Sequence, residues 1–295
     1  MYSYWRALSA FVFVFAFTRA LPTLAAPPVE AFGSLPGVEL ARLSPDGKRL
    51  AVIKPVNGRE KVVFLDLTQP NSAPYVVGME GALAMDVYWK SNDRAICIFH
   101  ANLTPKWTKG VSSWARAVSV MPSTQTAVLL MSNAPFFRAN FNEGSIADMD
   151  AGDPDHVLMT EVDRWDRDYM LDLYRVDLTN GFAELVTHGT TNTVRYIGDG
   201  YGHVVGQIEQ GSDLVNHVMV GASEVYKYDV RGGTAFEIEG LTIGANPQVA
   251  AERPTATGTT GLYSWGSPGS GVPLFESADY DVDDVLTDER NGRVI

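Results

Sequence analysis

Serine, histidine and carboxylate side chains could form a hydrolase site if their spacing allowed it. A serine hydrolase of the α/β type needs a Gly-x-Ser-x-Gly elbow, which exposes the nucleophilic serine on a sharp strand-to-helix turn. The 295-residue sequence contains no such pentapeptide. Around Ser223 the second glycine is missing, and before Gly269-Ser270 the first glycine is replaced by Pro268. Both segments are predicted to be loops, and we predict no catalytic residue in this chain.

The histidines and the acidic runs do not follow metal-binding patterns. The histidines show no His-x-x-x-His or His-Glu-x-x-His spacing; they are His100, His156, His188, His203 and His217. The acidic run at residues 279–284 begins like a calcium loop, which needs Gly at its sixth position and Glu at its twelfth. Those positions hold Asp284 and Arg290. We therefore predict a solvated turn there and no metal site.

Cofactor and thiol chemistry are also not indicated. The sequence has no Gly-x-x-x-x-Gly-Lys-Ser/Thr or Gly-x-Gly-x-x-Gly phosphate cradle between a strand and a helix, and we predict no cofactor. The single cysteine, Cys97, lies in the apolar run at residues 94–99, which predicts a small buried side chain rather than a nucleophile. The alternating charges at residues 161–168 are interpreted as a surface loop between two strands.

The elements that must position any site are short strands separated by turns. At residues 44–47, Ser-Pro-Asp-Gly precedes the apolar run at residues 50–53, and a second apolar run follows at residues 62–67. Proline presets φ, aspartate bonds its own backbone and glycine accepts positive φ, so this tetrapeptide predicts a tight turn between strands. Weaker copies of the turn occur at residues 89–94 and 153–156.

The strands recur along the chain. Five segments that could close a repeating unit begin at residues 63, 117, 173, 225 and 261, near the spacing of roughly 40 to 50 residues expected of four-stranded propeller blades. We predict an all-β fold, an incomplete β-propeller of about five blades. Residues 281–295 are predicted to be the opening hairpin of a further blade, and the chain is expected to be truncated. A β-sandwich or two small β domains is the alternative.

The first 25 residues predict a secretory signal peptide. Arg6 precedes an apolar run at residues 7–17, and Thr23-Leu24-Ala25 offers a small-residue cleavage site, with cleavage after Ala26 as the alternative. The run is shorter than the roughly 20 residues of a membrane span. The expected domains are therefore residues 1–25, the signal peptide, and residues 26–295, the propeller. We expect an exported protein, periplasmic or extracellular, without a membrane span in the mature chain.

Charge and size restrict the classes of partner. The formal net charge is −12, so binding to nucleic acid is not expected, because phosphate contacts need a basic face. With 45% hydrophobic residues, the chain can bury a sizeable core.

Several segments together resemble the N-terminal propeller of secreted serine peptidases of the prolyl oligopeptidase family, of the dipeptidyl- or acylaminoacyl-peptidase kind. Residues 32–36 and 38–51 resemble the family's entry into its first blade; residues 153–158 and 173–181 resemble a middle blade, and residues 280–295 a later one. The resemblance implies a propeller that restricts which peptides reach an α/β-hydrolase domain. The triad of that domain has no counterpart in this sequence.

Three functions follow from these observations. The first is a propeller portion of such a peptidase that gates or positions peptide substrates for a catalytic domain absent from this chain, with no activity of its own. The second is a stand-alone exported propeller of the TolB kind that binds a protein or peptide partner. The third is a sugar- or metal-dependent propeller enzyme, for which the sequence shows no ligand cluster.

Overall fold

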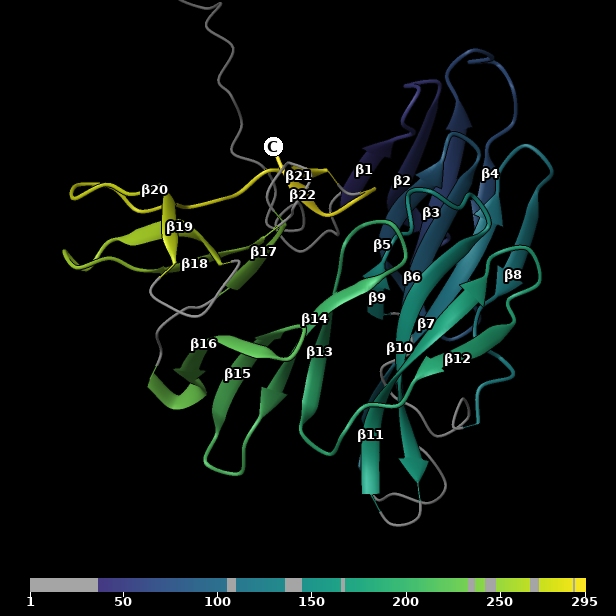
Figure 1. Cartoon of the computed structure of the whole chain (residues 1–295). Helices are drawn as coiled ribbons and strands as arrows, with labels where there is room; N and C mark the ends of the chain where they lie inside the picture. Colours follow the sequence, from purple (N-terminus) through teal and green to yellow (C-terminus); the bar gives the residue numbers. More distant parts are fainter. Residues whose placement is uncertain are drawn as a thin grey trace, which may run out of the picture. The chain divides into compact units, whose positions relative to one another are not determined.

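The computed structural model describes residues 37–104, 110–135, 145–165, 168–232, 237–241, 248–265, 271–288 and 290–295. Within these ranges the regular elements are β-strands, together with the 3-10 turn Val230–Gly232. The strands form five sheets, and four successive strands of each sheet pair in chain order as an antiparallel meander (Figure 1). The all-β prediction is confirmed. The predicted signal peptide lies outside the described residues, as does the segment 32–36.

The first two sheets contain the first eight strands. The first sheet consists of β1 (Leu40–Leu43), β2 (Arg49–Val56), β3 (Arg59–Asp66) and β4 (Tyr75–Val77). The second consists of β5 (Leu83–Ser91), β6 (Arg94–Leu103), β7 (Ser112–Met121) and β8 (Thr126–Leu129). Cys97 lies wholly buried in β6, as predicted. Burial raises the pKa of its thiol, so less of the cysteine is in the nucleophilic thiolate form.

The third and fourth sheets repeat the same order. The third consists of β9 (Ser145–Asp148), β10 (His156–Trp165), β11 (Asp168–Asp177) and β12 (Ala183–Thr187). The fourth consists of β13 (Thr193–Gly198), β14 (Val204–Gln210), β15 (Val215–Val220) and β16 (Ser223–Asp229). The segment that begins at Val225 lies in β16 and closes its sheet as the fourth strand, as expected. The segments that begin at residues 63, 117 and 173 lie in β3, β7 and β11, which are third strands, so they do not close their sheets.

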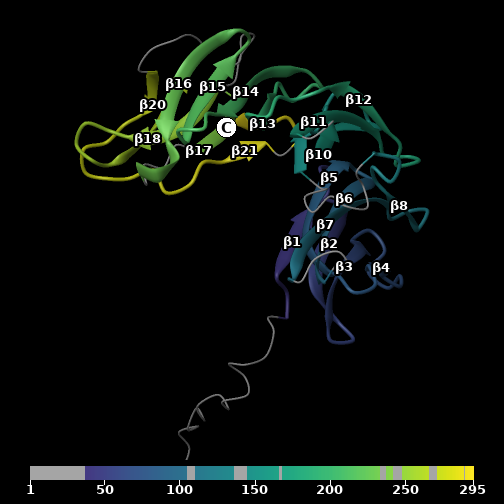
Figure 2. The same cartoon turned by 90° about the horizontal axis from the view of Figure 1, so that it is seen from below.

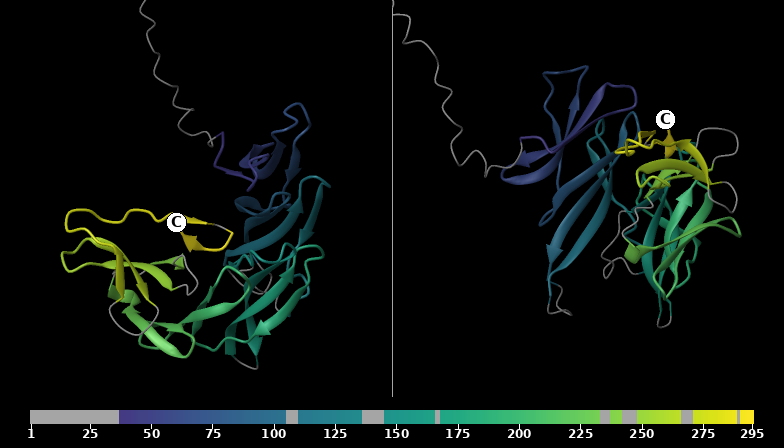
Figure 3. Two further views of the ribbon diagram at one scale, coloured as in Figure 1. Left: turned by 45° about the horizontal axis from the view of Figure 1, so that its top comes forward. Right: turned by 90° about the vertical axis from the view of Figure 1, so that its left-hand side faces the viewer.

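The fifth sheet has six strands. Its meander consists of β17 (Glu237–Leu241), β18 (Val249–Pro254), β19 (Thr260–Trp265) and β20 (Val272–Phe275). A hairpin of β21 (Thr287–Asp288) and β22 (Arg293–Val294) joins it, because β22 pairs in parallel with β17. Figure 2 shows β17, β18, β20 and β21 of this sheet on the same side of the chain. The predicted hairpin at the end of the sequence is thus present, but it extends the fifth sheet instead of beginning another one (yellow in Figure 3).

The predicted Ser-Pro-Asp-Gly turn joins β1 to β2. The Gly47 amide donates a hydrogen bond to the Ser44 carbonyl over 2.8 Å, and the Ser44 hydroxyl donates to the Asp46 carboxylate over 2.8 Å. Gly47 has a φ of 68°, the left-handed region that glycine adopts without steric cost. The Arg49 amide closes the turn by donating to the Ser44 hydroxyl over 2.9 Å. This residue pattern therefore makes the tight turn predicted for it.

Apolar side chains form clusters that consecutive sheets share. Phe64 of β3 and Trp89 of β5 meet edge to face with ring centroids 5.7 Å apart. Tyr196 of β13 packs with Leu158 and Leu173 of the third sheet. An edge-to-face aromatic pair such as Phe64–Trp89 contributes roughly 0.5 to 1.5 kcal/mol beyond the area that the two rings bury. Each sheet thus completes its core against its neighbours in the chain.

Residues 161–165 of the segment with alternating charges continue the strand β10 and do not form the surface loop expected. β10 continues to Trp165, and Glu161 and Asp163 are each 1% exposed. Glu161 lies directly opposite Asp172 of β11, which is fully buried. Residues two apart in a strand point to the same face, so the alternation reflects strand geometry. The prediction was wrong because carboxylates usually mark a solvated face.

Aspartates in several turns accept hydrogen bonds from side chains close in sequence. The Ser44 hydroxyl lowers the pKa of Asp46, the Thr68 hydroxyl lowers that of Asp66, and the Arg290 guanidinium lowers that of Asp288. A carboxyl whose pKa is lower in the folded state stabilises the fold above its unfolded pKa, and this stabilisation is lost as pH falls through the folded value.

We therefore expect the free energy of unfolding to decrease as the pH falls from about 5 to about 3. Urea denaturation followed by tryptophan fluorescence at several pH values measures this change. The double variant Asp46→Asn, Asp66→Asn lacks two of these carboxylates and should show a smaller decrease over the same range. A urea midpoint that stays constant between these pH values in the unaltered chain would contradict the prediction.

Candidate binding cavity

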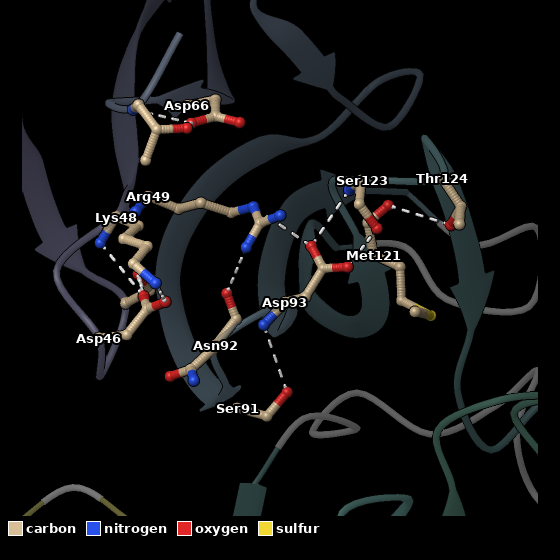
Figure 4. Close-up of polar contacts among 12 residues, drawn as sticks. Asp46, Lys48, Arg49, Asp66, Ser91, Asn92, Asp93, Met121, Ser123 and Thr124 are labelled. Carbon is tan, nitrogen blue, oxygen red and sulfur yellow. Dashed lines mark hydrogen bonds and ion pairs between the residues drawn. The ribbon is translucent and has the colours of Figure 1, made fainter.

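The turns that open the sheets also bind one sheet to the next. Figure 4 shows Arg49, at the start of β2, extending to the turn between β5 and β6. Its Nε lies 3.3 Å from the Asp93 carboxylate, and its Nη1 donates to the Asn92 carbonyl over 3.0 Å. The Asp93 carboxylate also accepts the Ser123 amide over 3.1 Å. The first and second sheets are therefore joined by an arginine that the first turn positions.

The second and third sheets are joined by an equivalent contact. Arg94, at the start of β6, donates to the Leu178 carbonyl over 2.7 Å, and its Nη2 lies 3.2 Å from the Asp155 carboxylate. Its side chain is 10% exposed. The degenerate turn copies at residues 89–94 and 153–156 thus provide the arginine and the aspartate of this bridge.

Lys90 of β5 makes a second bridge to the third sheet. Its buried Nζ donates to the carbonyls of Met149 and Asp150, the latter over 2.6 Å. Burial lowers the pKa of Lys90, while the nearby Asp150 carboxylate acts in the opposite direction. Two carbonyl acceptors replace the water that the ammonium loses. The bridge fixes the end of β9, which is the next strand of the site.

Asp148, at the end of β9, accepts three backbone hydrogen bonds. The donors are the amides of Asp150 over 2.6 Å, Gly200 over 2.6 Å and Gly202 over 3.1 Å. Burial raises the pKa of Asp148, and the three amides partly oppose that shift. Two of the donors lie between β13 and β14, so this carboxylate binds the fourth sheet to the third.

The loop after β13 approaches its neighbours closely enough to require glycine. A Cβ on Gly198 would lie 2.0 Å from the Asp148 carboxylate, and one on Gly200 would lie 2.1 Å from the Asn291 carbonyl. Gly200 also has a φ of 84°. Arg293 of β22 donates to the Asp199 carbonyl over 3.4 Å from the other side. The loop is therefore held between β9 and the C-terminal hairpin.

These contacts surround a cavity of about 850 Å³. Its walls come from the first strands of the second, third and fourth sheets, from adjoining parts of the third, and from the C-terminal hairpin. Apolar groups such as Ile98, Ile146 and Val194 alternate with polar groups such as Ser145 and Thr160. This volume lies in the range of pockets that bind small molecules.

The charged side chains that line the cavity differ in whether they have partners within the protein. Asp86 lies 3.1 Å from the Arg42 guanidinium and accepts the Tyr88 hydroxyl over 2.6 Å, and Asp148 accepts the three amides described above. Arg195 of β13 also lines the cavity and is exposed. No ion pair or hydrogen bond of its side chain occurs with the parts of the chain that the structure describes.

The residues that the sequence singled out for chemistry lie elsewhere. A histidine–serine contact joins His100 Nε2 to Ser113, and the other four histidines contact carboxylates, at Asp153, Asp172, Asp199 and Glu224. The acidic run at residues 279–284 is largely exposed, as expected of a solvated turn, and Asp281 accepts the Thr260 amide over 2.6 Å. Within the ranges described, no group of three histidine, cysteine or acidic side chains is placed to hold a metal ion.

The cavity was not predicted from the sequence. Its lining side chains come from strands that are distant in sequence, and an alternating pattern does not show which strand begins a sheet. One signal was available at Gly198-Asp199-Gly200-Tyr201-Gly202, where closely spaced glycines indicate close backbone approach.

Repeated four-stranded antiparallel meanders that share their cores with the next sheet define a β-propeller. No model of a known protein family matches the chain, and no curated protein matches it. Solved structures do show similarity. The acylaminoacyl peptidase of Pyrococcus horikoshii has 13% identity and a TM-score of 0.48, with 85% of this chain and 41% of that one covered.

Two other solved structures are similar. The β-propeller domain of the trilobed protease from Pyrococcus furiosus, described as having an open velcro topology, has 11% identity and a TM-score of 0.48, with 85% of this chain and 76% of that one covered. TolB from Acinetobacter baumannii has 13% identity and a TM-score of 0.40, with 80% and 56% covered. This chain thus spans less than half of the length of the acylaminoacyl peptidase.

Proposed function

We propose that this chain is the propeller portion of a prolyl-oligopeptidase-like serine peptidase and that it admits or positions peptides for a catalytic domain outside these 295 residues. The observation that carries the proposal is the cavity of about 850 Å³ among the first strands of successive sheets. The sequence resemblance of residues 38–51, 153–158 and 173–181 to the family's propeller supports it. Export follows from the proposed signal peptide at residues 1–25.

The lining of the cavity suits a peptide better than a compact polar ligand. Hydroxyl and backbone groups can pair with peptide amides, while Ile98, Ile146 and Val194 can contact apolar side chains. The two cavity carboxylates already have partners within the protein, so they do not require a cation from the ligand. We therefore assign the cavity a binding role, with bond cleavage left to the other domain.

Peptide binding by the purified chain tests this function. We expect biotinylated eight-residue peptides on a biolayer interferometry sensor to bind the chain saturably, and no peptide hydrolysis by the chain alone. The variant Gly200→Ala, which displaces the cavity wall, should lose binding, and Gly221→Ala, at an open turn, should retain it. If none of a varied set of peptides binds saturably, the proposal is overturned.

A stand-alone propeller that binds a protein or peptide partner, of the TolB kind, is the second candidate. The lack of a Gly-x-Ser-x-Gly motif in the sequence favours it. The DNA downstream of the coding sequence distinguishes the two functions. A reading frame that encodes Gly-x-Ser-x-Gly within roughly 200 to 300 codons supports the peptidase propeller, and the lack of any such frame supports the stand-alone protein.

A further inference from the structure

The charge of the cavity indicates which peptides would bind. The chain carries a formal net charge of −12, yet the exposed residue Arg195 lines the cavity. Asp86 is paired with Arg42 and Tyr88, and Asp148 with three backbone amides. Of the charged side chains that line the cavity within the described ranges, Arg195 is the one that the protein does not engage. A ligand carboxylate would complement it, and arginine can bind both carboxylate oxygens at once.

The strand that carries Arg195 also has an edge that can accept a peptide. β13 is the end strand of the fourth sheet, and its partner there is β14. β17, the first strand of the fifth sheet's four-stranded meander, shows what such an edge can bind: β22 pairs in parallel with it, with Leu241 opposite Arg293. An extended peptide that adds to a sheet edge gains main-chain hydrogen bonds, and pockets beside the edge select its side chains.

We propose that the cavity binds an extended peptide along the edge of β13, with a carboxylate of that peptide paired to Arg195. The inference rests on the proposed peptide-binding function and specifies its ligand class. The carboxylate is either the peptide's C-terminus or the side chain of an acidic residue. In both cases the guanidinium supplies a charged hydrogen bond inside a partly enclosed site, where it is stronger than at an open surface.

Three forms of one peptide pool separate these two sources. Each form is an N-terminally biotinylated eight-residue pool of uncharged residues: the first ends in a free carboxylate, the second ends in an amide, and the third ends in an amide and contains one glutamate. Affinities for the purified chain are measured by biolayer interferometry. We expect the amide pool to bind about tenfold more weakly than at least one carboxylate-bearing pool.

Variants of two exposed arginines identify the anchor. Arg195→Gln should bind all three pools with similar affinity, because the preference for a carboxylate is removed, and Arg195→Lys should retain part of that preference. Arg59→Gln removes the same charge from the start of β3, and it should behave as the unaltered chain. Since Arg195 is exposed, its replacement should leave the urea midpoint unchanged.

The outcomes distinguish this inference from the proposed function. If the unaltered chain binds none of the pools, the peptide-binding function fails. If it binds all three equally, or if Arg195→Gln retains the preference for a carboxylate, peptide binding stands and the Arg195 anchor is overturned.

A peptide methylated on alternate backbone nitrogens tests whether the ligand pairs with the edge of β13. Its binding should weaken about tenfold or more, because edge pairing needs the backbone N–H donors that methylation removes. Unchanged binding would overturn pairing with β13.

Discussion

Replacing Gly200 with alanine is expected to cost at least about 3 kcal/mol of unfolding free energy. The added Cβ would lie 2.1 Å from the Asn291 carbonyl and 2.7 Å from the Asn291 Cα, and the φ of 84° is unfavourable for alanine. Relief of the clash requires the loop or the C-terminal hairpin to move. Movement of the loop would also weaken the hydrogen bond from the Gly200 amide to Asp148.

Gly221→Ala is the matched control for this change. Gly221 also has a positive φ, 56°, but a Cβ there would meet nothing within 4 Å. We expect it to cost about 1 kcal/mol, the backbone penalty alone. Urea denaturation followed by tryptophan fluorescence compares the two variants. Equal losses would show that the contact between the loop and Asn291 does not support the fold.

Replacing Arg94 with methionine is expected to cost about 2 to 3 kcal/mol. Methionine keeps much of the apolar stem, so the loss reports the guanidinium. Without it, the Leu178 carbonyl loses its donor, and the Asp155 carboxylate loses its ion pair. The side chain is 10% exposed, so water replaces these contacts poorly.

Arg49→Met provides the comparison, because Arg49 makes the same kind of bridge in a more exposed place. Its side chain is 22% exposed, and its partners Asp93 and Asn92 lie in a turn. Exposed ion pairs contribute between about 0 and 1 kcal/mol, and we expect a loss near that range. Urea midpoints of the two variants measure the difference. A larger loss for Arg49→Met than for Arg94→Met would contradict the role of burial in these bridges.

Local chemistry made much of the fold predictable. The turn at residues 44–47 and the buried strand around Cys97 follow from proline, glycine and apolar patterning, and the structure has both. The four successive strands of each sheet also fit the four-stranded blades of the predicted propeller. These features depend on residues close together in sequence, whose preferences act before long-range packing does.

Features that depend on distant contacts were not predictable. Glu161 and Asp172 are buried opposite each other, although carboxylates usually indicate a solvated face. The pairing of β22 with β17 joins segments about 50 residues apart, and nothing in the alternation of either segment specifies the other. The cavity depends on several such contacts. Arg195 differs from the other charged residues that line the cavity because Asp86 and Asp148 are paired within the protein, which the sequence does not show.

The arginine bridges have a consequence for the order in which the chain can fold. Arg49 precedes its partner Asp93 in sequence, and Arg94 precedes Asp155. During synthesis, when a chain emerges from its N-terminus, each arginine lacks its partner until the following sheet begins to form. The first and second sheets would thus acquire their final stability only after the sheet that follows each of them appears. A ribosome that pauses between two sheets would leave the earlier one open to proteolysis at its newest edge.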